Sequence, residues 1–435
     1  MVDYAEVKIW GESVGAVRWI QNRGLASFQY HTMFLSKGWD ISPIKMPLKN
    51  GARTYSFPEL RQNRGEEAGT FKGLPGLLSD ALPDKYGNQL INVWLAQRGR
   101  PANSMNPVEQ LCFIGSRGMG ALEFEQPLFP SEKRAVTFEM KSLIDIAQEI
   151  LSQREGFGTN LKEDNRKAIS ELIKIGTSAG GARAKAVIAY NSKTGEVKSG
   201  QANAPKGFEH WLIKQDGVKD SQLGEGNGFG RVEYAYYLMA KDCGIDMMEC
   251  QLLKENGRAH FMTKRFDREG HDTKHHIQTF CGIQHYDYNN LYSYSYEQLF
   301  QTMRILKLTY PEAEQMFRRM VFNVMAINYD DHTKNFSFRL KKDGKWQLSP
   351  AYDVCYAYDP NNPWVSQHTL SINGKYMEIT KADLMTIAKA NNIKKGEQMI
   401  NEIKAVVSNW QQYAERAEVA QNLRNAITKT LIALT

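Results

Sequence analysis

Three oxygen-bearing side chains in one part of the sequence have the types and spacing that phosphoryl transfer requires. Asp330 and Asn335 stand five positions apart in a polar stretch, and Asp353 follows further along the chain. Phosphoryl transfer is catalysed mostly by positioning and charge neutralisation, so one carboxylate must orient the attacking hydroxyl and accept its proton. Amide and carboxylate oxygens are ligands that suit Mg²⁺. We therefore assign Asp330 as the catalytic base and Asn335 and Asp353 as ligands of a magnesium ion.

The segments around these residues predict a helix and a hairpin that hold them in place. Thr309 followed by Glu312 predicts a capping box, and apolar residues at helical spacing continue from there to Ile327. After the polar stretch, alternating apolar residues on both sides of a Lys-Asp-Gly turn predict a hairpin over residues 336–348.

The polar loop between helix and hairpin allows a structural and a chemical interpretation. Asp330 and Asp331 could simply form a polar turn behind the helix. Asp330, however, stands at the D-x-x-x-x-N spacing from Asn335, whereas Asp331 is one position too close. A loop Asp, an Asn five positions later, a hairpin and a second Asp are together typical of the phosphotransfer half of a protein-kinase-like fold. This combination favours the chemical interpretation.

A protein-kinase-like fold also needs a β-rich part that binds the phosphates of ATP. Residues 176–185 are rich in Gly and Ala and run into a strand, so backbone N–H groups there could approach phosphate oxygens. Alone this signal is weak, because the stretch is neither G-x-G-x-x-G nor a Walker A motif. Lys214 ends a predicted strand over residues 210–214 and is the candidate catalytic lysine for the α- and β-phosphates. Glu233, in a predicted helix over residues 232–241, is the candidate to pair with it.

Two other glycine-rich stretches are interpreted as structural. Residues 224–230 follow the lysine strand and precede a helix, which favours a connection between the two elements. Residues 115–120 lie in the first part of the chain, where a turn is the simpler interpretation.

Composition narrows the class of protein. The chain has 435 residues, of which 42% are hydrophobic and 24% charged, and these values exclude a disordered or collagenous chain. The net charge of +7 is spread along the sequence, so it does not by itself indicate nucleic-acid binding. The five cysteines form no C-x-x-C pair, which disfavours a zinc finger and a disulfide framework. Without a secretory signal or a long apolar run, the expected location is the cytoplasm.

With these motifs in place, the chain resembles the HipA family, the kinase-fold toxins of bacterial toxin–antitoxin pairs. Residues 178–185 resemble the family's S-x-x-G-A-x-x-K loop, and residues 330–337 resemble its D-x-H-x-K-N-F-S catalytic loop. Residues 350–353 resemble its P-x-Y-D metal motif, and residues 265–268 match the R-F-D-R at the hinge between the lobes. The resemblance runs nearly from end to end.

The resemblance implies an α+β, protein-kinase-like bilobal fold with a small N-terminal β-rich subdomain. Residues 1–130 would form the HipA-like N-terminal subdomain. Residues 131–267 would form the kinase N-lobe with the phosphate loop and the ATP lysine. Residues 268–435 would form the helical C-lobe with the catalytic and metal-binding loops. Two prolines followed by a charged run at residues 126–134 independently favour a boundary there.

The resemblance also implies which residues bind ATP. The backbone of Lys264 to Phe266 would hold adenine, and Asp267 would lie near the ribose. His332, between the base and the first metal ligand, could position the loop by hydrogen bonding. The full ATP-binding set is Ser178, Ala179, Gly180, Gly181, Ala182, Lys214, Lys264, Phe266, Asp267 and His332.

Ser178 is implied as the serine that family members autophosphorylate, which would expel the loop and stop the kinase. A phosphate carries a charge of about −2, so it would repel a nucleotide from a loop that cradles phosphates. Some family members have an acid at the position of Ala184 and a Gly at the position of Asp331. Neither departure removes a catalytic group, so we expect an active kinase.

The resemblance therefore implies an ATP- and Mg²⁺-dependent Ser/Thr protein kinase that acts as a growth-inhibiting toxin. Its substrate would be a translation component such as an aminoacyl-tRNA synthetase. Its partner would be a HipB-like DNA-binding antitoxin, through which alone it would reach DNA, and no membrane would be involved. Two alternatives stay open: a phosphotransferase acting on a lipid or small-molecule hydroxyl, and a nucleotide-binding corepressor that works through the antitoxin.

Overall fold

The computed structural model describes residues 2–61, 69–126, 128, 147, 173, 175–176, 184–200, 204–217, 228–270 and 272–432. The predicted phosphate loop over residues 178–182 lies outside the described residues, as does most of the linker predicted at residues 126–134. The chain divides into two compact units, here called unit 1 and unit 2. Unit 1 comprises Met1–Ile41, Met46–Gly230 and Gln251–Ile277, and unit 2 comprises Ser42–Lys45, Arg231–Cys250 and Gln278–Thr435.

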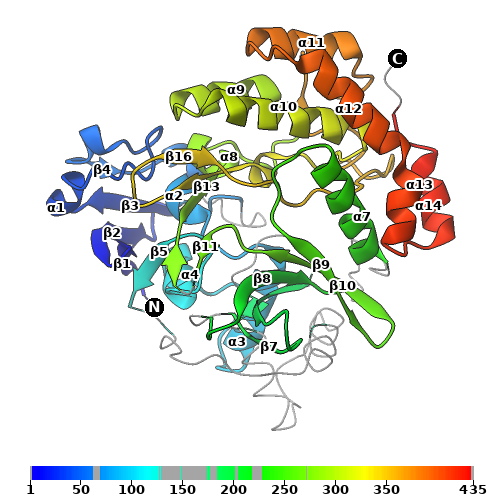
Figure 1. The fold of residues 1–435 in the computed structure, drawn as a ribbon. Coiled ribbons are helices and arrows are strands. Elements are labelled where there is room, and N and C mark those ends of the chain that lie inside the picture. Colours follow the sequence, from blue (N-terminus) through cyan, green and yellow to red (C-terminus); the bar gives the residue numbers. More distant parts are fainter. Residues whose placement is uncertain are drawn as a thin grey trace. The chain divides into compact units, whose positions relative to one another are not determined.

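The first sheet of unit 1 has five strands in the order β4-β3-β2-β1-β5 (Figure 1). A hairpin at the start of the chain begins this sheet, with a turn at Trp10 and Gly11, which both have positive φ. Alternate residues of the hairpin, including Val7 and Val17, are fully buried. The strands are β1 (Tyr4–Ile9), β2 (Glu12–Ile20), β3 (Leu25–Tyr30), β4 (Thr54–Tyr55) and β5 (Leu122–Glu125).

The second sheet of unit 1 has the order β7-β6-β8-β10-β9. Its strands are β6 (Lys185–Tyr190), β7 (Val197–Ser199), β8 (Glu209–Lys214), β9 (Cys250–Glu255) and β10 (Arg258–Lys264). A short hairpin follows, with strands β11 (Arg268–Glu269) and β12 (Thr273–Lys274). The helices of unit 1 are α1 (Thr32–Leu35), α2 (Gly76–Ser79), α3 (Lys85–Ala96) and α4 (Pro107–Ile114), with 3₁₀ turns at Leu48–Asn50 and Pro58–Leu60.

One hydrophobic core joins these helices to the second sheet. Trp94 of α3 and Phe113 of α4 belong to the same buried cluster as Ile188 of β6 and Trp211 of β8. The two aromatic rings from the helices meet edge to face, with centroids 5.1 Å apart. This shared core is why residues on both sides of the boundary predicted at residue 130 lie in a single compact unit.

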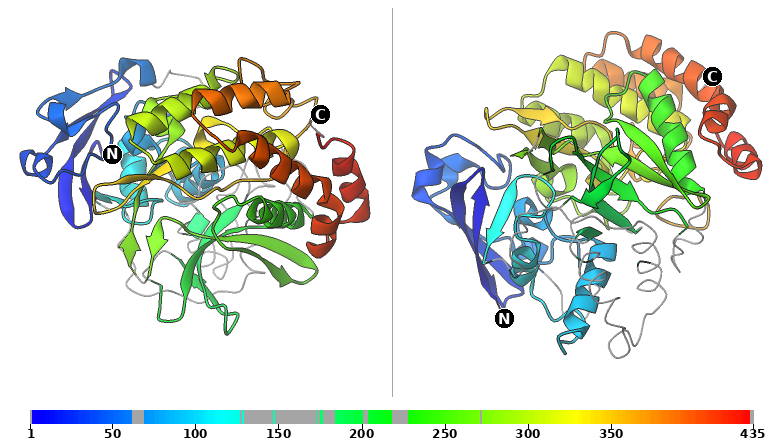
Figure 2. Two further views of the ribbon diagram at one scale, coloured as in Figure 1. Left: turned by 45° about the horizontal axis from the view of Figure 1, so that its top comes forward. Right: turned by 60° about the horizontal axis from the view of Figure 1, so that its bottom comes forward.

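Unit 2 is mainly helical. The capping box predicted at Thr309 and Glu312 is present and begins α10, along which α12 packs (Figure 2). The helices are α7 (Phe229–Asp242), α8 (Phe280–Gln284), α9 (Tyr296–Ile305), α10 (Tyr310–Met325), α11 (Lys381–Ala390), α12 (Gly396–Ser408), α13 (Trp410–Arg416) and α14 (Gln421–Thr428). The strands are β13 (His276–Thr279), β14 (Tyr294–Ser295), β15 (Ser337–Leu340), β16 (Trp346–Leu348) and β17 (Leu370–Ser371).

Helix α7 is held by the helices of unit 2, although the sequence analysis assigns residues 232–241 to the same lobe as Lys214. The buried Tyr236 hydroxyl donates to the carbonyl oxygen of Ala326 at 2.5 Å. Its ring packs edge to face on Trp410, at 5.5 Å between centroids. Tyr413 donates a further hydrogen bond to Asp242 at 2.6 Å. The aromatic contacts of α7 with distant helices therefore decide where this helix belongs.

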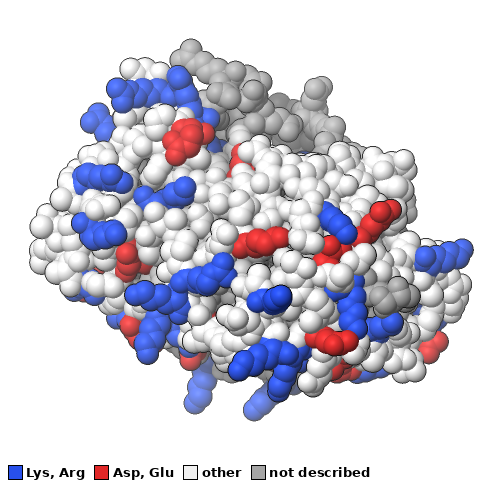
Figure 3. Space-filling view, turned by 90° about the horizontal axis from the view of Figure 1, so that it is seen from above, with Lys and Arg blue, Asp and Glu red and all other residues white. Residues whose placement is uncertain are grey.

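Charges on the face in Figure 3 are mixed. Lysine and arginine side chains are scattered over it, with aspartate and glutamate among them, as the spread of charge along the sequence predicts. Among the helices described, none combines the length and the apolar character that crossing a membrane requires.

Candidate active site

The predicted helix, loop and hairpin are all present in unit 2. Helix α10 ends at Met325, and the left-handed backbone of Ile327, with φ of 53°, turns the chain into the loop. Asn328 donates its backbone N–H to the carbonyl oxygen of Asn323 at 3.0 Å, which completes the end of the helix. Strands β15 and β16 then pair as an antiparallel hairpin. Local sequence signals therefore position the catalytic loop.

The loop orients Asp330 and Asn335 differently. The side chain of Asp330 is 45% exposed, so its carboxylate can be reached by a hydroxyl from solvent. Asn335 uses its side-chain N–H to donate to the backbone oxygen of Asp330. Because the amide nitrogen is engaged in this way, the amide oxygen is the atom that Asn335 offers to another group.

His332 fixes the turn between these two residues. Its Nδ1 accepts a hydrogen bond from the backbone N–H of Lys334 at 3.2 Å, at the start of the 3₁₀ turn Thr333–Asn335. This is the positioning hydrogen bond expected for His332. Its Nε2 lies 3.6 Å from a carboxylate oxygen of Asp330, too far for a hydrogen bond but close enough for electrostatic interaction if the ring is protonated.

Asp331 has an environment opposite to that of Asp330. It is 1% exposed, and its carboxylate accepts hydrogen bonds from Tyr296, His368 and the backbone of Thr369. Its carboxylate is therefore enclosed by protein donors. The sequence analysis excluded Asp331 as the base only by spacing and gave it no other role.

Asp353 lies on the second loop of the site and has a left-handed backbone, with φ of 51°. Tyr352 donates its hydroxyl to the carbonyl oxygen of Lys334 at 2.8 Å, and this bond ties the P-x-Y-D motif to the catalytic loop. Ala351 donates its N–H to the carbonyl oxygen of Asp246 at 2.8 Å. These bonds hold the two loops of the site together.

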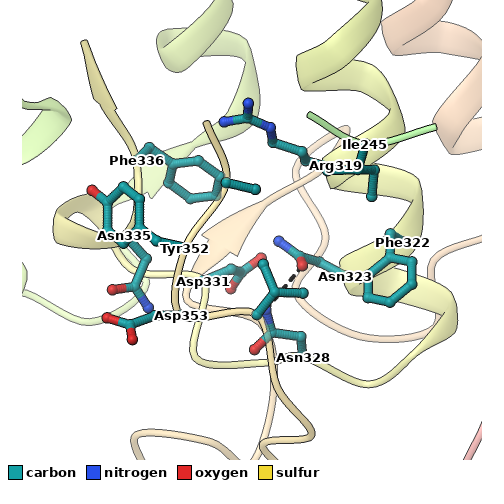
Figure 4. Close-up of a pocket in the computed structure, with 12 residues that line it drawn as sticks. Ile245, Arg319, Phe322, Asn323, Asn328, Asp331, Asn335, Phe336, Tyr352 and Asp353 are labelled. Carbon is teal, nitrogen blue, oxygen red and sulfur yellow. Dashed lines mark hydrogen bonds between the residues drawn. The ribbon is translucent and has the colours of Figure 1, made fainter. Parts of the chain in front are cut away.

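Asn335 and Asp353 line one pocket of unit 2, together with Asp331, Asn323 and Asn328 (Figure 4). They bring one amide oxygen and one carboxylate to it, and both are hard donors of the kind that suits Mg²⁺. No group of three or more His, Cys, Asp or Glu side chains gathers around a metal position in the part of the chain that the structure describes. Protein-bound Mg²⁺ commonly has only one or two carboxylate ligands and takes the rest from phosphates and water, so the donor set fits the ion.

In unit 1, Lys214 lies in a row of three residues on three neighbouring strands of the second sheet. Lys185 of β6 and Phe261 of β10 stand directly opposite Lys214 of β8, one on each side. Directly opposed residues of antiparallel strands point to the same face. The Lys214 ammonium lies 5.7 Å from the centre of the Phe261 ring, and Lys185 is 3% exposed. Lys185 is the last residue of the predicted loop motif, for which no role is predicted from the sequence. Its position at the start of a predicted strand is the feature of the sequence that could have indicated one.

The end of β8 behind Lys214 is anchored by a second set of polar groups. Asp216 accepts hydrogen bonds from the backbone N–H groups of Gly228 at 3.0 Å and Ala259 at 3.1 Å. Its own N–H donates to Nδ1 of His260, whose pKa is lowered by burial. A neutral His260 can accept this bond, so hydrogen bonds of Asp216 anchor the end of the lysine strand.

Asp267 lies at the centre of a buried network of charged groups in unit 1. Its carboxylate is fully buried and accepts hydrogen bonds from Arg265 at 2.7 and 2.8 Å, from Arg268 at 2.7 Å and from the N–H of Gly120 at 2.7 Å. Burial alone would raise its pKa, but the guanidinium groups of Arg265 and Arg268 outweigh burial and hold the pKa well below the usual range. These protein donors give the carboxylate a structural role in this network, and the ribose contact implied for Asp267 stays a prediction.

The same network gives a role to the glycine-rich turn at residues 115–120. Arg265 and Arg268 donate to the carbonyl oxygen of Gly118, and Arg268 also donates to that of Gly120. A Cβ atom at Gly120 would lie 3.2 Å from the backbone of Ile277, and the φ of +79° disfavours any other residue. The turn therefore fastens the N-terminal part of unit 1 to the segment after β10.

The remaining predicted ATP-binding residues are placed as follows. Lys264 ends β10 and pairs with the carboxylate of Glu209, and Phe266 is half-buried in the segment after it. Ser178, Ala179, Gly180, Gly181 and Ala182 lie outside the described residues. Glu233 is buried on α7 in unit 2, whereas Lys214 belongs to unit 1, so their pairing stays a prediction.

Aromatic side chains stand beside the catalytic loop in unit 2. The Tyr288 ring lies 5.3 Å from the His332 ring and 6.0 Å from the Trp364 ring, and the Lys334 ammonium lies 4.9 Å from its centre. The sequence analysis missed these residues, although the run of tyrosines over residues 286–296 is visible in the sequence. Nothing in the local pattern connects that run to Asp330, because the two stretches meet only in the folded chain.

Two family models match this chain. Residues 5–125 match the family described as HipA N-terminal domain, and residues 177–410 match the family described as HipA-like C-terminal domain. A search of curated proteins found no match.

Two solved structures align with the chain to different degrees. The first is a HipA chain of Shewanella oneidensis MR-1, from a complex of HipA, HipB and operator DNA. It aligns over 98% of this chain and 100% of its own, with 16% identity and a TM-score of 0.64. The second is the Helicobacter pylori proinflammatory kinase CtkA, which aligns over 58% of this chain and 92% of its own. Its 14% identity and TM-score of 0.32 are too low for a conclusion about the fold. The first alignment confirms the predicted fold, α+β and protein-kinase-like with a small N-terminal β-rich subdomain.

Proposed function

The chain belongs to the HipA family, and from that premise we propose that it is an ATP- and Mg²⁺-dependent Ser/Thr protein kinase acting as the toxin of a toxin–antitoxin pair. One observation carries the proposal. The accessible carboxylate of Asp330 stands on the same loop as Asn335, and Asn335 shares a pocket with Asp353. This is the combination of base and hard oxygen ligands that phosphoryl transfer requires.

In this proposal each residue of unit 2 has one task. Asp330 accepts the proton of the acceptor hydroxyl as that oxygen attacks the γ-phosphorus of ATP; the bond from this phosphorus to the bridging oxygen breaks, and ADP leaves. Asn335 and Asp353 hold Mg²⁺, which when bound neutralises charge on the transferring phosphoryl group. His332 and Tyr352 keep the two loops in place through their hydrogen bonds to the backbone of Lys334.

Lys214 in unit 1 is proposed to contact the α- and β-phosphates, and Lys185 is added to it. Lys185 stands directly opposite Lys214 on the neighbouring strand, so the two side chains point to the same face of the sheet. Two positive charges on one face favour an anion there, and the phosphates of ATP are such an anion. The opposed lysines therefore support a phosphate position on this face of β6 and β8.

The regulatory and biological parts of the proposal rest on the resemblance to the family. Ser178 is the proposed site of autophosphorylation, and a translation component such as an aminoacyl-tRNA synthetase is the proposed substrate, in the cytoplasm. A HipB-like antitoxin is the proposed partner, through which the kinase would reach DNA. The Shewanella HipA was solved in a complex with HipB and operator DNA, which supports such a partner here.

Intact-mass spectrometry after incubation with Mg²⁺-ATP tests the proposal. The wild type is expected to gain one phosphate of about 80 Da that maps to Ser178. Asp330→Ala is expected to gain none. The kinase assignment is wrong if the wild type gains no phosphate and also adds none to any lysate protein beyond what Asp330→Ala adds.

A further inference from the structure

We propose that Asp331 and His368 form a buried carboxylate–imidazole pair that positions the catalytic loop and so sets the rate of phosphoryl transfer. The inference rests on the proposed kinase function, in which Asp330 is the base. It adds two positioning residues that neither spacing nor the family motifs single out. Asp331 is the residue next to Asp330, and His368 is 37 positions away in the sequence.

The carboxylate of Asp331 accepts hydrogen bonds from the segment that contains His368 and Thr369 and from helix α9. His368 donates from Nδ1 to Oδ2 at 2.8 Å, and the backbone N–H of Thr369 donates to Oδ1 at 2.7 Å. Tyr296, at the start of α9, donates its hydroxyl to Oδ2 at 2.9 Å. Burial and then the Asp331 carboxylate raise the pKa of Tyr296 well above its usual value, so its hydroxyl stays protonated and donates.

The imidazole of His368 is oriented by its bond to Asp331. His368 is 1% exposed, and its Nε2 has no hydrogen-bond partner in the described part of the chain. Among the described residues, the bond from Nδ1 to the carboxylate is therefore the hydrogen bond that fixes the plane of the ring.

Both neighbours of Asp330 are held by the same short segment. Asp331 is bonded to His368 and Thr369, and Thr369 also donates its hydroxyl to the carbonyl oxygen of Tyr329 at 3.3 Å. The ring of Tyr329 packs on the ring of His368, with 4.4 Å between centroids. The backbone on either side of Asp330 is thus fixed, while the Asp330 carboxylate itself is 45% exposed.

The network continues into the two helices below the loop. Tyr296 accepts a hydrogen bond from Asn323 of α10 at 2.9 Å, and Asn323 accepts one from Asn328 at 2.9 Å (Figure 4). The pair therefore connects the loop to rigid elements instead of to solvent. A displacement of about 1 Å at reacting groups can cost about 100-fold in rate. A pair that fixes the position of Asp330 would act on the transfer rate more than on nucleotide binding.

Two substitutions of His368 test the inference in the full chain. His368→Asn keeps an N–H donor near the position of Nδ1, whereas His368→Leu keeps comparable bulk and removes the donor. The rate of autophosphorylation at saturating Mg²⁺-ATP, the affinity for ADP and the melting temperature are measured for each. We expect His368→Leu to lower the rate about 10- to 100-fold with ADP affinity within about twofold. His368→Asn should stay within about threefold of the wild type.

The matched control is Asp383→Asn, which alters another mostly buried carboxylate of unit 2 that also accepts several hydrogen bonds. It is expected to lower the melting temperature without changing the rate per folded molecule. If His368→Leu fails to fold, the near-isosteric Asp331→Asn replaces it, with the same expected loss of rate.

The outcomes are distinguishable. If the wild type phosphorylates itself and the donor-free variant matches it per folded molecule, the positioning role is overturned. The same holds if the Leu and Asn variants lose equal rate, or if the loss follows ADP affinity or the folded fraction. If the wild type adds no phosphate to itself or to lysate proteins, the kinase assignment fails and this inference fails with it.

Discussion

At the scale of residues, two neighbouring aspartates show how environment divides one side-chain type between two roles. Asp330 is 45% exposed, and Asp331 is buried among donors. A carboxylate enclosed by protein donors is not reached by a substrate hydroxyl, whereas an accessible one can be. This difference supports Asp330 as the proposed base and Asp331 as the proposed positioning residue.

Asp330→Asn removes the base but leaves the loop intact. We expect the rate of phosphoryl transfer to fall about 10³-fold, because general-base catalysis contributes about 10²- to 10⁴-fold. The melting temperature should change by no more than about two degrees, since the side chain is 45% exposed and Asn has nearly the same shape. Autophosphorylation kinetics and thermal unfolding check both parts. Asp343→Asn in the exposed hairpin turn is the control, and a variant at Asp330 that keeps the wild-type rate would contradict the assignment.

Asp267→Ala tests the structural role given to the hinge carboxylate. Removing it leaves Arg265 and Arg268 buried without their shared counter-ion, which is expected to lower the free energy of unfolding by about 3–5 kcal/mol. Urea unfolding measures the change, and Asp272→Ala at a nearby exposed aspartate is the control. An unfolding free energy equal to that of the wild type would contradict the buried network.

The same carboxylate predicts a pH dependence. The pKa of Asp267 is held below its usual range in the folded chain, so its stabilising effect is present above the unfolded pKa of about 4 and is lost as the pH falls below it. The difference in unfolding free energy between wild type and Asp267→Asn should be constant from about pH 7 to pH 5 and shrink below about pH 4. Urea unfolding at several pH values checks this. A difference that grows as the solution becomes more acidic would reverse the sign and refute the argument.

At the scale of elements, the start of the catalytic loop is fixed by two helices that are far apart in the sequence. Ala326 directly follows α10, and its carbonyl oxygen accepts the hydroxyl of Tyr236 from α7. Ile327 follows with a left-handed backbone, a strained conformation for a β-branched residue. Such strain persists only where the surroundings hold it, and the contact between α7 and the end of α10 is part of that support.

Tyr236→Phe removes this hydroxyl and leaves a buried carbonyl without its donor. We expect the free energy of unfolding to fall by about 1–2 kcal/mol, with the ring contacts preserved. Chemical denaturation provides the measurement. Tyr234→Phe on the more exposed side of α7 is the control and should change stability by less than about 0.5 kcal/mol. Equal effects at the two positions would show that the hydroxyl contributes nothing.

At the scale of the whole molecule, the chain forms two compact units, and each unit combines segments that are separated in the sequence. The part that matches the HipA N-terminal domain family shares one core with the second sheet of unit 1. Helix α7, which the chain enters after leaving β8, belongs instead to unit 2. The domain boundaries at residues 130 and 267 stay a prediction. The two compact units are defined instead by which helices and strands pack together.

Trp94→Ala tests the shared core of unit 1. The loss of a buried tryptophan is expected to cost about 3–5 kcal/mol. Because β6 and β8 pack on the same cluster, hydrogen exchange should accelerate in these strands as well as in α3, while α10 and α12 stay protected. Met33→Ala, at an 83% exposed side chain, is the control. Faster exchange confined to residues 69–126 would show that the N-terminal part has a core of its own.

Sequence alone determined the features that depend on neighbours along the chain. The capping box at Thr309, the hairpin after the loop and the spacing of Asp330 from Asn335 are all local, because turns, caps and periodicity act over a few residues. The family motifs are recognised by the order and spacing of their residues, and the resemblance to them then implied roles for those residues.

Only the tertiary structure decided what distant residues do together. It enclosed Asp267 with Arg265, Arg268 and the turn at Gly120, and it placed α7 against α10. It also brought His368 to Asp331. Burial and hydrogen bonding between residues far apart in the sequence depend on how whole elements pack, and no local pattern carries that information. The residues proposed for the chemistry were therefore visible in the sequence, and the groups proposed to hold them in position were not.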